Sequence, residues 1–97
     1  MLLDMLKDDP KDSFLRYAMS LELNKAGRKR DAITALEEIH ADDPSYLAVY
    51  YQLGQFYEQI GIPEKALTYY EQGVELAQKQ REMKILGELR AAIDIID

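Results

Sequence analysis

The sequence predicts an all-α fold, a helical solenoid built from antiparallel helix pairs. Residues 42–44 (Asp-Asp-Pro) repeat residues 8–10 at a distance of 34 positions, and Gly61 repeats Gly27 at the same distance. Between these marks, apolar residues recur at the three- and four-residue spacing of one helix face. A fixed period of this length is typical of stacked helix–turn–helix units. A protein of this kind offers a surface to a partner rather than a site for a reaction.

The composition indicates one domain and excludes several classes of protein. The chain has 97 residues, of which 47% are hydrophobic, so a single domain (1–97) can bury its own core. It has no cysteine, which agrees with a cytoplasmic location and removes disulfides and cysteine-based metal sites. The longest apolar run, Tyr46 to Tyr51, is far shorter than the roughly 20 residues of a membrane span. Asp4 interrupts the apolar amino terminus, so we expect neither a signal peptide nor a membrane partner.

The charge pattern argues against nucleic acid as a partner. The net charge is −6, whereas binding a polyphosphate requires clustered positive charge. One basic group surrounds Gly27 and consists of Lys25, Arg28, Lys29 and Arg30. Cations near a helix carboxyl terminus fit a solvated turn, and a basic contact patch is the alternative.

Two helices are expected on either side of Gly27. Asp9 is a candidate N-cap and Pro10 suits the first helical position, so the first helix is expected to span 10–26. Gly27 stands where a left-handed residue would end it. Each helix has one apolar face, made of Leu15, Met19, Leu23 and Ala26 in the first and Ala32, Ile33, Leu36 and Ile39 in the second.

Three further helices complete the predicted fold. Asp43 and Pro44 restart the pattern for a third helix, and Pro63 opens a fourth. A last helix, from about 81 to 96, would cap the end of the array. No residue marks the break assumed before it, so one continuous helix from Pro63 is the alternative. The apolar faces are Val49, Leu53, Phe56, Tyr57 and Ile60; then Ala66, Leu67, Tyr70, Gly73, Val74 and Ala77; then Met83, Leu86, Leu89, Ile93 and Ile96.

These elements divide the single predicted domain into four parts. We expect a partial amino-terminal helix (1–9), a first repeat (10–43), a second repeat (44–80) and a capping helix (81–97).

The repeated marks resemble the tetratricopeptide repeat family, whose 34-residue unit carries small residues where its two helices cross. The matching positions are Ser20 and Gly54 for the small residue of the first helix, Ala32 and Ala66 for the alanine of the second, Leu36 and Tyr70 for the large residue beneath it, Gly27 and Gly61 at the turn, and Pro44 at the end of the first unit. The resemblance implies a right-handed solenoid and a non-catalytic scaffold for protein–protein interaction.

The chain departs from the family pattern at three positions. Arg16 and Tyr50 replace the usual bulky residue early in the first helix, and Ile39 and Gly73 replace a later alanine. Gln78 stands in place of the second closing proline, as a terminal unit followed by a cap would allow.

By the same resemblance, the first helix of each repeat lines a concave groove that holds a peptide or a helix. We expect Tyr17 and Tyr51 at its centre, because tyrosine offers apolar area and one polar tip at low entropic cost. The partner would carry apolar anchors, with a cation toward Glu58. The candidate groove residues are Phe14, Tyr17, Leu21, Asn24, Lys25, Tyr51, Gln55, Glu58, Ile85 and Leu89.

The sequence is compatible with three states of this groove. The groove is free; or the last helix fills it, with Ile85 and Leu89 over the tyrosines; or exposed apolar surface at the ends pairs two copies in a homodimer. The lysine and asparagine clamp of chaperone-binding family members is absent. A chaperone adaptor of that type is therefore not expected.

The sequence predicts no enzyme, no cofactor and no metal site. His40 is the only histidine, and its place near a helix end fits a surface role. The acidic pairs at 8–9 and 42–43 precede prolines and are interpreted as helix caps. Neither a glycine-rich phosphate loop nor a Gly-x-Ser-x-Gly elbow occurs.

Overall fold

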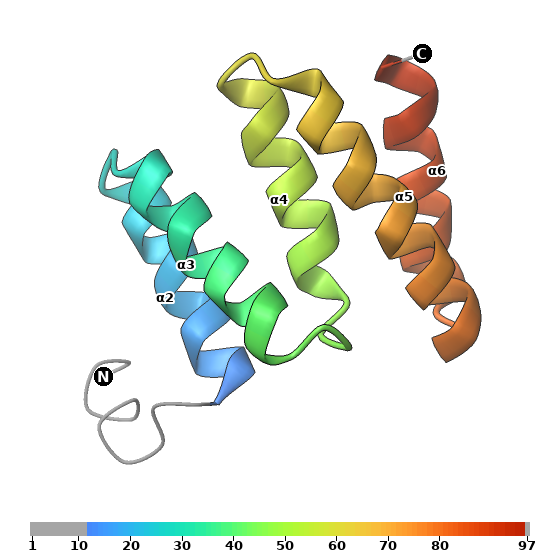
Figure 1. Cartoon of the computed structure of the whole chain (residues 1–97), viewed down its shortest axis with the longest axis horizontal. Coiled ribbons are helices and arrows are strands. Elements are labelled where there is room, and N and C mark those ends of the chain that lie inside the picture. Colours follow the sequence, from blue (N-terminus) through green and yellow to red (C-terminus); the bar gives the residue numbers. More distant parts are fainter. Residues whose placement is uncertain (1–11, 97) are drawn as a thin grey trace. The chain divides into compact units, whose positions relative to one another are not determined.

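In the computed structural model, which describes residues 12–96, the described chain consists of α-helices without a strand, so the all-α prediction is confirmed (Figure 1). The helices are α2 (Ser13–Lys25), α3 (Lys29–Asp42), α4 (Ala48–Gln59), α5 (Pro63–Gln80) and α6 (Met83–Ile96). The predicted helix at 1–9 and the predicted N-cap Asp9 lie outside the described residues. Within residues 12–96, no helix combines the length and apolar character needed to cross a membrane.

The chain divides into two compact units, Met1–Val49 and Tyr50–Asp97. In the first unit, α2 packs against α3, and in the second, α5 packs against α6. Neighbouring helices within each unit run antiparallel, as the short connections predict (Figure 1).

Three helices end in the same way, on a residue with left-handed backbone conformation. These residues are Gly27 (φ 81°), Gly61 (φ 82°) and Arg81 (φ 58°). In each case its N–H donates to the carbonyl three residues back and the next N–H to the carbonyl five residues back, at 2.9–3.3 Å. This pattern satisfies the last carbonyls of a helix and turns the chain. Both predicted glycine stops are confirmed, and the alternative of one continuous helix from Pro63 is wrong.

No feature of the sequence indicated the break at Arg81, because a residue with left-handed backbone conformation is normally glycine. A side chain with a β-carbon adopts this conformation at a cost of about 1–2 kcal/mol. Arg81 takes it because the hydrogen bonds of the turn and the burial of Leu86, Leu89 and Ala92 require α6 to double back along α5.

Two predicted helix starts are wrong. Helix α2 begins at Ser13 rather than at residue 10, and its N-cap is Asp12, whose side chain accepts a hydrogen bond from the Leu15 N–H at 2.9 Å. Helix α4 begins at Ala48, since Pro44 lies in the turn that follows α3. The acidic pair at 42–43 therefore does not cap α4.

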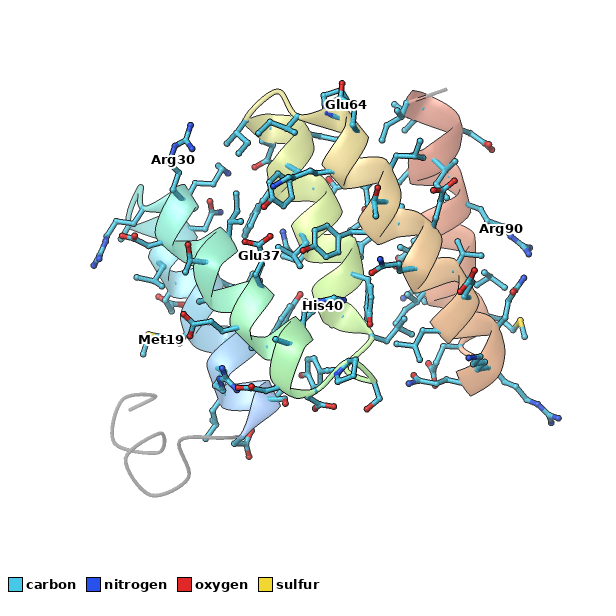
Figure 2. The ribbon with its side chains drawn as sticks, viewed as in Figure 1. Met19, Arg30, Glu37, His40, Glu64 and Arg90 are labelled. Atoms are coloured by element: carbon cyan, nitrogen blue, oxygen red, sulfur yellow. The ribbon has the colours of Figure 1, made fainter. Side chains whose placement is uncertain are left out.

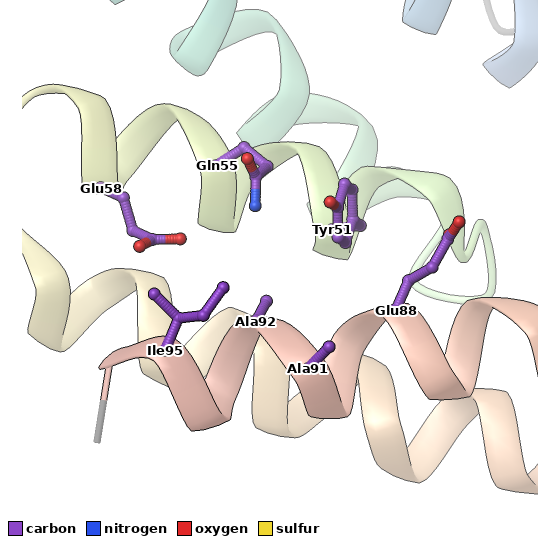
Figure 3. Close-up of a pocket in the computed structure, with 7 residues that line it drawn as sticks. All are labelled: Tyr51, Gln55, Glu58, Glu88, Ala91, Ala92 and Ile95. Atoms are coloured by element: carbon purple, nitrogen blue, oxygen red, sulfur yellow. The ribbon is translucent and has the colours of Figure 1, made fainter.

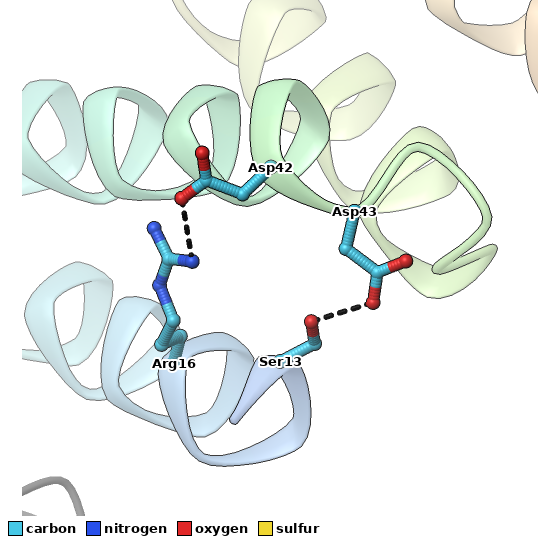
Figure 4. Close-up of polar contacts among 4 residues, drawn as sticks. All are labelled: Ser13, Arg16, Asp42 and Asp43. Atoms are coloured by element: carbon cyan, nitrogen blue, oxygen red, sulfur yellow. Dashed lines mark hydrogen bonds and ion pairs between the residues drawn. The ribbon is translucent and has the colours of Figure 1, made fainter. Parts of the chain in front are cut away.

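Asp42 and Asp43 instead hold the end of α3 to the start of α2 (Figure 4). The Ser13 hydroxyl donates to Asp43 at 2.6 Å, and the Arg16 guanidinium lies 3.0 Å from the Asp42 carboxylate. The Ser45 hydroxyl also donates to Asp43, at 2.9 Å. The hydrogen bonds from Ser13 and Ser45 hold the pKa of Asp43 below its usual value, and the Ser13 bond is the main cause. Arg16, which replaces the usual bulky residue of the family pattern, thus forms an ion pair with Asp42.

In the first unit, the buried residue of α2 is polar. Ser20 is fully buried and its hydroxyl donates to the Tyr17 carbonyl at 2.6 Å. The predicted core residues Leu15, Met19 and Leu23 are only half-buried and Ala26 is exposed, so that part of the prediction is wrong. The buried apolar residues of the unit are Ala32, Ile33, Leu36, Ile39, Leu47 and Val49.

In the second unit, two glycines let the helices approach closely. A β-carbon built on Gly54 of α4 would lie 2.0 Å from a ring carbon of Tyr70 on α5. A β-carbon on Gly73 of α5 would lie 2.9 Å from the Tyr50 β-carbon and 3.1 Å from the Leu89 methyl groups. The buried apolar residues of the unit are Tyr50, Leu53, Phe56, Tyr57, Ala66, Tyr70, Ala77, Leu86, Leu89 and Ala92.

We expect Arg81→Gly to stabilise the protein by about 1 kcal/mol, because glycine removes the left-handed strain at this helix end. Gly61→Ala, at the equivalent end of α4, should destabilise it by about the same amount. Urea denaturation measures both. Destabilisation by Arg81→Gly would contradict the strain argument.

We expect Asp43→Asn to lower the free energy of unfolding by about 1 kcal/mol at pH 7. The folded-state pKa of Asp43 is depressed below 3.8, so its contribution is present above that pH and is lost as the pH falls through the folded pKa. The difference between the native protein and the variant should therefore shrink in denaturation series from pH 7 to pH 3. Asp94→Asn, at an exposed position of α6, is the matched control and should show no such convergence.

Candidate functional site

A pocket of about 340 Å³ lies in the second unit between α4 and α6 (Figure 3). Its volume is at the lower end of the range for ligand pockets and suits one or two side chains. Tyr51, Gln55 and Glu58 line it from α4, and Glu88, Ala91, Ala92 and Ile95 line it from α6.

The polar wall of the pocket is fixed from beneath by Tyr70 of α5. This tyrosine is fully buried, and its hydroxyl contacts both Gln55 and Glu58. The hydroxyl donates its one proton to the Glu58 carboxylate and accepts a hydrogen bond from the Gln55 side-chain amide at 2.6 Å. Because the amide nitrogen of Gln55 points to Tyr70, its carbonyl oxygen is left as an acceptor, as is the second carboxylate oxygen of Glu58.

Burial and the Glu58 carboxylate both raise the pKa of Tyr70, burial being the larger cause. Tyr70 therefore stays protonated at neutral pH and remains a donor to Glu58. The Tyr51 ring lies 6.1 Å from the Tyr70 ring, so the aromatic wall of the pocket rests on the same residue.

The pocket is acidic. Its lining contains two carboxylates, Glu58 and Glu88, and none of its seven described lining residues is Lys or Arg. Arg90 projects from α6 into solvent and does not line it (Figure 2). Within residues 12–96, no group of three or more His, Cys, Asp or Glu residues is arranged to hold a metal ion.

The predicted groove residues of α2 lie in the first unit. Phe14 is 64% exposed, Leu21 and Asn24 are half-buried, and Lys25 forms an ion pair with Glu22 at 3.6 Å. The Tyr17 ring lies 5.9 Å from the Tyr46 ring, and burial, with Tyr46 beside it, raises the pKa of Tyr17. The groove centred on Tyr17 and Tyr51 involves both units and stays a prediction.

In the second unit, the structure brings three of the five predicted groove residues together. Tyr51, Gln55 and Glu58 line the pocket. Leu89 is fully buried, close to Gly73 of α5, so its assignment to an accessible groove is wrong. Ile85 is half-buried and does not line the pocket.

The sequence analysis did not assign Glu88, Ala91 or Ile95 of α6 to the groove, although all three line the pocket. Glu88, Ala91 and Ile95 recur at helical spacing, but alanine and glutamate give no apolar stripe to detect. Tyr70 was assigned to the core only, although a buried tyrosine hydroxyl requires a hydrogen-bond partner. The need for such a partner, together with Gln55 and Glu58 on the neighbouring helix, could have indicated from the sequence that Tyr70 contributes to the site.

The basic group around Gly27 is partly neutralised within the first unit. Arg28 lies 2.7 Å from the Asp31 carboxylate, and Lys25 is paired with Glu22. The solvated-turn interpretation fits these pairs better than a basic contact patch.

Comparison with known proteins agrees with the repeat pattern. The family model for the tetratricopeptide repeat matches residues 23–94. The chain belongs to the tetratricopeptide repeat family. No curated protein matches it.

Several solved structures are similar to this chain. A solution structure of such a domain protein from Salinibacter ruber is 36% identical with a TM-score of 0.88, covering 92% of this chain and 90% of that one. A crystal structure of a tetratricopeptide repeat domain protein from the same organism is 35% identical with a TM-score of 0.83, covering 88% and 94%. A protein from Bordetella parapertussis shares the fold at 21% identity and a TM-score of 0.83, covering 98% and 83%.

The departures from the tetratricopeptide repeat pattern in the second unit compensate one another. Tyr50 is buried and its β-carbon comes close to α5 at Gly73, where the family has alanine. The large residue on one helix is therefore matched by the loss of a side chain on the other. In the first unit, the equivalent positions hold the ion-paired Arg16 and the fully buried Ile39.

We expect Gly54→Ala to destabilise the protein by roughly 3 kcal/mol, because the added methyl group collides with the Tyr70 ring. Tyr70→Leu in the same chain should recover part of this loss, so the two changes should couple by at least about 1 kcal/mol in a double-mutant cycle measured by urea denaturation. Gly87→Ala is the control, since a β-carbon on Gly87 meets nothing within 4 Å. Additive effects of the two changes would contradict the collision.

Proposed function

We propose that this protein is a non-catalytic interaction module that binds a segment of a partner polypeptide at the pocket between α4 and α6. Members of the tetratricopeptide repeat family generally mediate protein–protein interactions. The observation that carries the proposal is the pocket itself, whose polar residues Gln55 and Glu58 are held in place by a buried hydroxyl.

The character of the walls supports a polypeptide ligand. Tyr51 contributes an aromatic surface, and Ile95 is 81% exposed at the other side. Aromatic and aliphatic residues around a few fixed polar groups are typical of sites that hold a side chain. Because Tyr70 already orders Gln55 and Glu58, a ligand need not immobilise them on binding.

The exposed apolar residues of α6 favour a second candidate, self-association. Met83 is 63% exposed and Ile95 is 81% exposed, and exposed apolar surface tends to be covered by a partner or by a second copy. In this case α6 would be the interface between two copies.

To test the first candidate, we would select peptides from a displayed library against the whole chain and measure their affinities by calorimetry. Ala91→Met places a larger, uncharged side chain in the pocket and should weaken binding at least tenfold. Ala41→Met, at an exposed helical position of α3 in the first unit, is the matched control and should leave the affinity unchanged. Equal affinity for both variants would mean that the pocket is not the site.

Light scattering on the same samples separates the second candidate from the first. A mass of one chain at all concentrations supports peptide binding. A mass near twice that, falling on dilution and abolished by Ile95→Lys, supports self-association through α6.

A further inference from the structure

We infer that the pocket between α4 and α6 selects an arginine side chain of the partner. This inference rests on the proposed function and names the chemistry of the residue that would enter the site.

The electrostatics of the pocket call for a cation. Figure 3 shows Glu58 near one end and Glu88 near the other, with Ala91 and Ala92 between them. A positively charged group therefore meets a carboxylate at each end and no opposing cation among the described lining residues. The net charge of −6 favours the approach of such a group.

The hydrogen-bonding groups call for a donor-rich cation. The Tyr70 hydroxyl occupies one oxygen of Glu58 and the amide nitrogen of Gln55. The second Glu58 oxygen remains an acceptor, and Glu88 brings a second carboxylate to the lining. A planar guanidinium presents several N–H groups in a fixed fork that matches a carboxylate, whereas an ammonium is a point charge.

The remaining walls fit the rest of an arginine side chain. The methyl groups of Ala91 and Ala92 and the side chain of Ile95 offer an apolar path for the three methylene groups of the stem. The Tyr51 ring lies on the opposite side, and guanidinium groups stack on aromatic rings. A volume of about 340 Å³ holds one such side chain with room for its backbone.

The test uses blocked single residues and the whole chain, followed by nitrogen-15 NMR. N-acetyl-arginine methylamide should shift the signals of the Gln55 side-chain amide and the Ala92 backbone amide in a saturable way. The citrulline analogue has nearly the same shape without the charge and should bind at least tenfold more weakly, as should the lysine analogue.

Two variants locate the charge that the probe meets. Glu58→Gln should weaken arginine binding about tenfold. Since this change also touches the Tyr70 bond, Glu88→Gln, at an exposed position of α6, is the second variant and should weaken binding several-fold. Glu38→Gln, exposed on α3 of the first unit, is the control and should have no effect.

The inference is overturned if the citrulline or lysine analogue binds as well as the arginine one, if the arginine probe causes no saturable shift, or if both pocket variants bind it unchanged. The proposed function has a separate outcome, because library peptides that lose affinity for Ala91→Met but show no arginine preference would support the module and reject the arginine site.

Discussion

The contact between Gly54 and the Tyr70 ring is the constraint on which the second unit depends. Helix α4 can approach α5 only where it has no side chain, and the ring fills the space that glycine leaves. Close packing of this kind tolerates little change in volume, so the size of one residue fixes the size of the other. The same ring carries the hydroxyl that organises the pocket, so core and site share one residue.

This sharing has a physical reason. A tyrosine whose ring is fully buried needs a partner for its hydroxyl, since an unpaired buried polar group is costly. Gln55 and Glu58 meet that need and lose their rotational freedom as a result. A requirement of the core thereby holds two polar side chains in place at the wall of the pocket.

Sequence reasoning found the helices, both glycine stops and the small and large residues of each repeat, because these follow from spacing and backbone conformation. It misplaced the starts of α2 and α4 because an aspartate before a proline is compatible with either a helix cap or a turn. It could not find Arg81 as a helix stop, since arginine carries no preference for the left-handed region.

The candidate site was only half predictable. The α4 side followed from the period, which placed Tyr51, Gln55 and Glu58 on one face. The α6 side depended on the rotation of that helix about its axis, and this is set by Leu89 packing close to Gly73 rather than by a stripe in the sequence. Leu89 therefore lies in the core, and the neighbouring Glu88 and Ala92 line the pocket instead.

The paired sizes at the helix crossings also bear on how repeats of this type can be recombined. The second unit pairs glycine with tyrosine, whereas the first holds Ser20 and Leu36, both fully buried, at the corresponding places. A chimaera that joined the first helix of one repeat to the second helix of the other would combine Ser20 with Tyr70, which puts a β-carbon where the ring needs glycine, or Gly54 with Leu36, which are together smaller than either native pair. Repeats of this type should therefore be exchanged as intact helix pairs, since a single helix fits only the helix with which it packs.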